Sequence, residues 1–131
     1  MPGGFFDTNV ILYLLDDGAK CDRAEALLAQ GGTISVQVLN EAMVNCLRKA
    51  RMSQDEAQEF LHGIRQLCQV RDLDLRTHDV GLALQARYGF SVYDSMIVAA
   101  ALIAGCESLW SEDMHNGLLV EGQLRIRNPF T

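Results

Sequence analysis

Apolar residues follow two patterns along the chain: short apolar runs, and longer segments with apolar residues at helical spacing. The short runs predict strands over residues 3–7, 33–36, 70–75, 108–111 and 124–127. The helical spacing predicts helices over residues 10–15, 22–30, 40–51, 77–88 and 93–104, and another behind a capping box of Ser53 and Glu56. Strands that alternate with helices are typical of βαβ units, so we expect a parallel sheet covered by helices on both faces.

The composition indicates one globular domain spanning residues 1–131. Of the 131 residues, 49% are hydrophobic and 21% are charged, which is the balance of a chain that can bury a core. The longest apolar run, residues 96–104, is too short to span a membrane, and no secretory signal is visible at the start. The 4 cysteines lack zinc-finger spacing, which favours buried thiols in a reducing compartment. We therefore expect a cytoplasmic protein without membrane attachment.

Four acidic residues lie where predicted strands give way to helices: Asp7 and Asp113 at strand ends, and Glu41 and Asp94 near helix starts. Each alone has an ordinary interpretation, since an acid in the first helical turn complements the helix dipole. In a doubly wound sheet, however, the carboxyl ends of the strands form the ligand site. The topology can therefore gather all four acids at one edge of the sheet.

Carboxylates gathered in this way indicate a cation site. Two carboxylates about 4 Å apart repel each other by about 4 kcal/mol at an effective dielectric constant of 20. Such a group needs a cation or raised pKa values, and oxygen-only ligands favour hard ions such as Mg²⁺ or Mn²⁺. The formal net charge of -6 argues against a general phosphate-binding surface, but a nuclease site can itself be acidic.

The segments that carry these acids resemble, in order, the four acidic motifs of PIN domains. They are FDTNV at 6–10, QVLNE at 37–41, YDSMIVAAA at 93–101 and SEDM at 111–114. The closing segment IRNPF at 126–130 is similar to the C-terminal strand of bacterial VapC-type toxins. No single motif is specific, but the five segments occur in the family's order along the whole chain.

The resemblance implies a fold, an activity and partners. The fold would be a three-layer α/β/α sandwich with a five-stranded parallel sheet. The activity would be that of a Mg²⁺- or Mn²⁺-dependent endoribonuclease, which cleaves single-stranded regions of RNA by metal-activated water. The implied partners are an RNA substrate and a cognate antitoxin, since such enzymes are the toxins of toxin–antitoxin pairs; homodimer formation is left open. In the family, the positions matching Asp7, Glu41, Asp94 and Asp113 hold the metal and are catalytic, and those matching Asn9 and Ser111 orient the site.

Residues 48–51 contain the densest basic cluster of the chain, formed by Arg48, Lys49 and Arg51. A solvated helix end is its default interpretation, because cations suit a helix C-terminus. Contact with RNA or with an acidic partner is the alternative. Glu112 is a reserve acid in case Asp113 points away from the site, and we expect His115 to be a bystander.

Three other classes of protein are alternatives to this interpretation. A phosphoacceptor domain needs adjacent acids after its first strand and a lysine near its last one, but two phenylalanines precede Asp7 and the only lysines are Lys20 and Lys49. A dehalogenase-type phosphatase needs a second aspartate where Asn9 stands. The remaining alternative is a non-catalytic PIN-like module that binds protein or RNA.

Overall fold

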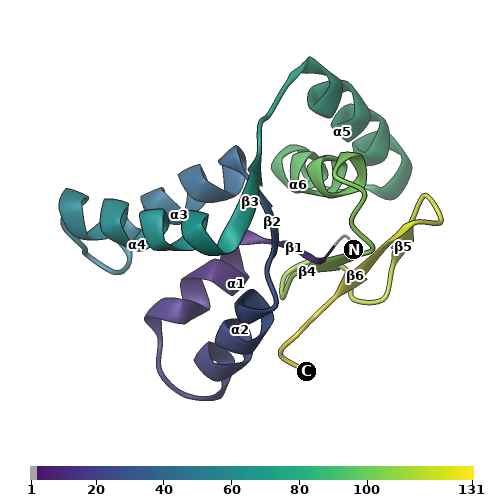
Figure 1. Ribbon diagram of the computed structural model, residues 1–131. Helices are drawn as coiled ribbons and strands as arrows, with labels where there is room; N and C mark the ends of the chain where they lie inside the picture. The colour runs from purple at the N-terminus through teal and green to yellow at the C-terminus, as the bar shows by residue number, and fades with distance from the viewer. Residues whose placement is uncertain (1–2) are drawn as a thin grey trace.

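The computed structural model describes residues 3–131 as a twisted sheet between two groups of helices (Figure 1). The strands are β1 (Phe5–Phe6), β2 (Gly32–Ser35), β3 (Cys68–Arg71), β4 (Ser108–Trp110), β5 (Leu119–Val120) and β6 (Leu124–Arg127). The helices are α1 (Thr8–Leu12), the 3₁₀ turn η1 (Tyr13–Leu15), α2 (Ala19–Ala29), α3 (Val36–Arg48), α4 (Gln54–Leu67), α5 (Leu75–Tyr88) and α6 (Val92–Ile103). Helices α1 to α4 lie on one side of the sheet, and α5 and α6 on the other (Figure 1).

The strand order is β3-β2-β1-β4-β6-β5, and the first five strands in this order run parallel. The predicted α/β sandwich with five parallel strands is thereby confirmed. The sixth strand, β5, pairs antiparallel with β6 and was not predicted. Two residues are too few to give a periodic signal. A turn through Glu121 and Gly122, both with positive φ, reverses the chain between the two strands.

Several predicted boundaries are wrong, and for two of them a cap explains the difference. The helix expected from residue 40 begins at Val36, because the side chain of Ser35 accepts a hydrogen bond from the amide of Val38. The helix expected from residue 77 begins at Leu75, because Asp74 and not Thr77 is its cap. The strand expected over 70–75 lies at 68–71, although it is an edge strand as predicted.

Other local predictions are confirmed. Ser53 and Glu56 form the capping box of α4, and Gly89 ends α5 in the left-handed conformation. All four cysteines are buried and free. Among residues 3–131, no helix is long and apolar enough to cross a membrane.

The sheet and helix α6 supply the centre of the core. Phe5, Ile34, Leu109 and Ile126 come from four adjacent strands and are fully buried. Helix α6 buries the run from Ile97 to Ala101, which explains why its sequence is apolar on nearly every side. Burial of each large apolar side chain stabilises the fold by about 1.5–3 kcal/mol. This rigid centre fixes the ends of β1 and β4, where the acids lie.

Candidate active site

A cavity of about 520 Å³ lies beyond the carboxyl ends of β1 and β4, the two neighbouring strands at the middle of the sheet. The chain fills one half of the sheet with β1, β2 and β3 and then returns to place β4 on the other side of β1. Such a switch point leaves a crevice in open α/β sheets. The cavity is lined by all four predicted acids: Asp7, Glu41, Asp94 and Asp113.

Asp7 is the most buried of the four acids, with 6% of its surface exposed. It follows β1 directly and caps α1, and its Oδ1 accepts a hydrogen bond from the amide of Thr8 at 2.7 Å. Its Oδ2 accepts one from Oγ of Ser111 at 2.7 Å. Burial raises the pKa of Asp7 to about 6, against the lowering effect of these two hydrogen bonds, and the charges of Asp94 and Glu41 raise it further.

Asn9 and Ser111 connect Asp7 to Asp113. The side-chain amide Nδ2 of Asn9 donates to Oδ2 of Asp113 at 3.1 Å and lies 3.4 Å from Oδ2 of Asp7. The hydroxyl of Ser111 accepts a hydrogen bond from the amide of Asp113 at 3.3 Å. Both side chains therefore lie where they can fix the relative positions of the two carboxylates.

Glu41 is held by two residues that sequence reasoning missed, Thr8 and Gln37. Oγ1 of Thr8 donates to Oε1 of Glu41 at 2.6 Å, and Nε2 of Gln37 donates to Oε2 at 3.0 Å. Nε2 of Gln37 also donates to the backbone oxygen of Tyr93 at 2.9 Å, beside Asp94. The spacing of Gln37 and Glu41, four residues apart on one helix, is the sequence signal that could have identified this pair.

Asp94 lies in the first turn of α6, where Ser91 caps the helix by accepting a hydrogen bond from the amide of Asp94. Its side chain is partly buried. Burial raises the pKa of Asp94 and the hydrogen bond with Ser91 lowers it, while the charges of Glu41 and Asp113 raise it further. The acids from four separate segments thus act on one another electrostatically.

Residues 4–115 match the family model described as PIN domain. The chain belongs to the PIN-domain family. The matched range contains β1 to β4, the helices between them and the four acids, so it includes the whole acidic side of the cavity described above.

Solved structures with the fold of this PIN domain include toxin–antitoxin proteins. A toxin–antitoxin complex from Klebsiella pneumoniae gives a TM-score of 0.76 at 18% identity, covering 98% of each chain. DNA-bound VapBC from Salmonella typhimurium gives 0.73 at 20% identity, covering 98% of this chain and 99% of that one. VapC20 of Mycobacterium tuberculosis, a sarcin–ricin-loop-cleaving toxin, gives a TM-score of 0.65 at 19% identity, covering 82% of this chain and 87% of that one. No curated protein sequence matches this chain significantly.

No cation neutralises the acids of the PIN domain within residues 3–131. The two ion pairs in this part of the chain, Lys20 with Glu112 and Arg87 with Glu121, involve none of the four. The described residues contain no group of three His, Cys, Asp or Glu side chains close enough to hold a metal ion as they stand. The donor set is composed of carboxylate oxygens with uncompensated charge, which fits a hard divalent cation.

The three residues of the predicted basic cluster do not all lie at the cavity. Lys49 lines the acidic cavity, whereas Arg48 and Arg51 are exposed and do not line it. Glu112, the reserve acid, turns toward Lys20 and lies 2.6 Å from its Nζ, so Asp113 is the acid that lines the cavity. His115 is exposed.

Proposed function

We propose that this PIN domain is a Mg²⁺- or Mn²⁺-dependent endoribonuclease that cleaves single-stranded RNA. The observation that carries the proposal is the cavity lined by Asp7, Glu41, Asp94 and Asp113, none of which has an ion-pair partner within residues 3–131. Acids gathered without a counter-charge are costly unless a cation joins them. Membership of the PIN family supports the same conclusion, because nucleases of this family use divalent metal ions.

The four acids would hold the ion, and when bound it would activate water and neutralise phosphate oxygens. The other residues of the cavity have positioning roles. Ser111 and the amide of Thr8 donate to the two oxygens of Asp7 and favour its ionised form, against the larger effect of burial. Asn9 ties Asp7 to Asp113, and Gln37 ties Glu41 to the start of α6. These hydrogen bonds limit the reorganisation that binding of the ion requires.

The cleavage test uses labelled single-stranded RNA with Mn²⁺ and the purified wild-type protein. Asp7→Asn and Asp94→Asn each remove one carboxylate at nearly constant volume, and we expect both to lower the cleavage rate by a factor of at least 100. Asp79→Asn, which changes an exposed acid on α5, is the matched control for charge and should retain wild-type activity. Equal cleavage by all four proteins would identify a contaminating nuclease and remove the proposal.

We further propose that the protein is the toxin of a toxin–antitoxin pair. The support is the fold that it shares with toxin–antitoxin proteins of Klebsiella and Salmonella. Expression should arrest growth, and co-expression of a small neighbouring gene product should relieve the arrest. Growth that continues normally would remove the toxin role and leave the ribonuclease proposal to its own test.

The alternative is a non-catalytic PIN-like module that binds protein or RNA. One observation favours it: the described acids do not form a compact three-ligand group. Calorimetry separates the two functions, because the enzyme takes up Mn²⁺ at the acidic cavity and the module does not.

A further inference from the structure

A second cavity of about 430 Å³ adjoins the acidic one. Asn9, Leu12, Asn45 and Lys49 line both, so the two form one continuous cleft. The second cavity extends away from the acids to the end of η1 and to Ala50, which follows α3. A ligand bound at the acids can therefore extend into it without leaving the protein surface.

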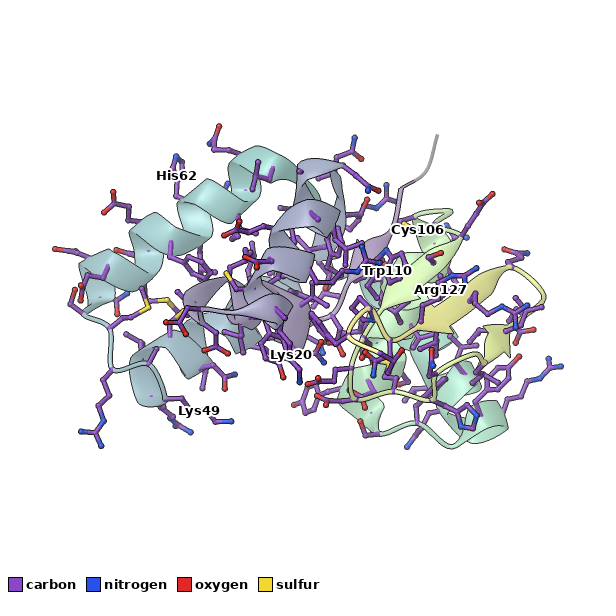
Figure 2. The ribbon with its side chains drawn as sticks, turned by 90° about the horizontal axis from the view of Figure 1, so that it is seen from below. Lys20, Lys49, His62, Cys106, Trp110 and Arg127 are labelled. Atoms are coloured by element: carbon purple, nitrogen blue, oxygen red, sulfur yellow. The ribbon has the colours of Figure 1, made fainter. Side chains whose placement is uncertain are left out.

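Lys49 is the one cation that lines either cavity within residues 3–131. Figure 2 labels it at the end of α3, and it forms no ion pair with a described residue. An ammonium group at the junction of the cavities is placed to bind a phosphate, which the four acids would otherwise repel. The expected ligand is therefore an anionic chain that reaches from the acids past Lys49.

The wall of the second cavity is suited to a nucleobase. Leu12, Tyr13, Leu15 and Ala50 provide an apolar and aromatic surface. Single-stranded RNA is recognised mainly through unstacked bases that bind to such surfaces. The hydroxyl of Tyr13 is already committed, since it donates to Glu112 and accepts a hydrogen bond from Lys20. Nζ of Lys20 also lies 4.8 Å from the centroid of the Tyr13 ring, and the ring of Phe130 packs against it at a centroid distance of 4.7 Å, so only the part of the ring that lines the cavity can contact a base.

Besides Lys49, which is assigned to a phosphate, this wall carries uncommitted hydrogen-bond acceptors. Asn45 uses one N–H of its Nδ2 to donate to the backbone oxygen of Glu41, and its Oδ1 is placed to accept a hydrogen bond. The carboxylate of Asp16 lines the same wall. Adenine, cytosine and guanine each carry an exocyclic amino group that donates to such acceptors, and uracil carries none.

We propose that the second cavity binds the base of a nucleotide adjacent to the scissile phosphate. The phosphate of that nucleotide would contact Lys49, and bases with an exocyclic amino group would be preferred over uracil. This inference rests on the proposed ribonuclease function and adds the subsite that selects the substrate. An antitoxin segment in the same cavity is the competing occupant. RNA is favoured because the cavity is continuous with the acids and its single cation lies at the junction.

The test measures binding of labelled octamers of adenylate and of uridylate in buffer with EDTA and low salt, in which RNA is not cleaved. Ala50→Phe fills the cavity and Lys49→Met removes the cation, and each should weaken adenylate binding about tenfold, the effect of one base or phosphate contact. The matched controls on α5 are Ala86→Phe and Arg76→Met, which change exposed residues and should bind as the wild type does. The preference for adenylate over uridylate should disappear in Ala50→Phe.

The same variants are then assayed for cleavage with Mn²⁺, where Ala50→Phe should raise KM and leave kcat nearly unchanged. Binding that depends on Ala50 and Lys49 without any cleavage would retain the subsite and remove the ribonuclease. Cleavage and binding that are unaffected in both variants would overturn the subsite and retain the ribonuclease. If Ala50→Phe abolished only the complex with a cognate antitoxin, the cavity would belong to that protein instead.

Discussion

The buried carboxyl group of Asp7 gives this PIN domain a measurable pH dependence of stability. Burial raises its pKa from 3.8 to about 6. The carboxyl proton of Asp7 is therefore held more tightly in the folded protein than in the unfolded chain. The contribution of the protonated group to the free energy of unfolding is complete below about pH 4 and is lost as the pH rises through about 6. A shift of about two units corresponds to about 3 kcal/mol in the free energy of unfolding.

The substitution Asp7→Asn removes this titration and keeps the side-chain volume. We expect the metal-free wild-type protein to lose about 3 kcal/mol more than the variant between pH 4 and pH 7. Urea unfolding of both proteins at several pH values provides the measurement. The variant should consequently retain more of its pH 4 free energy of unfolding at pH 7 than the wild-type protein does.

Asp74→Asn is the control with the opposite sign. Hydrogen bonds from the amide and hydroxyl of Thr77 lower the pKa of Asp74, so its contribution is present near neutral pH and is lost as the pH falls through the folded-state pKa. If wild type and Asp7→Asn showed the same change in stability between pH 4 and pH 7, the description of Asp7 as a buried, destabilised carboxylate would be refuted.

Three further predictions concern the surroundings of the site and the fold. Lys20→Met should lower Mn²⁺-dependent cleavage several-fold with little loss of stability. The exposed ion pair with Glu112 contributes little to the free energy of unfolding, but it holds the segment that carries Asp113. Arg87→Met, at the other ion pair, should leave cleavage unchanged. Ser53→Ala should cost about 1 kcal/mol in urea unfolding by removing the cap of α4, without changing Mn²⁺ affinity. Gly32→Ala should lower the free energy of unfolding by about 1–3 kcal/mol, since the added Cβ would lie 2.6 Å from the backbone oxygen of Gly4. Unchanged urea midpoints in Ser53→Ala and Gly32→Ala would contradict the capping and packing described.

Local sequence patterns predicted the parts of the fold that depend on neighbours along the chain. The capping box at Ser53 and the end of α5 at Gly89 each involve residues within one or two helical turns. The placement of Asp7 and Asp113 also followed from local pattern, because each comes after a short apolar strand. The sequence alone therefore predicts that these acids lie at one edge of the sheet.

The hydrogen-bond network of the site could not be predicted in the same way. Thr8 and Glu41 are 33 residues apart, and Asn9 and Asp113 are 104 residues apart. Such pairs leave no periodic signal in the sequence, because only the order of strands in the sheet brings them together. For the same reason, the sequence could not show whether Glu112 pairs with Lys20 or serves as a metal ligand.

Calorimetric titration of Mn²⁺ into the wild-type protein and into Asp94→Asn tests the central claim most directly. The wild type should bind Mn²⁺ with release of protons near pH 6, because burial raises the pKa of both Asp7 and Asp94. Asp94→Asn should bind at least tenfold more weakly, and Asp79→Asn should bind as the wild type does. Equal Mn²⁺ affinity in all three proteins, or no binding by the wild type, would contradict a metal site at these acids.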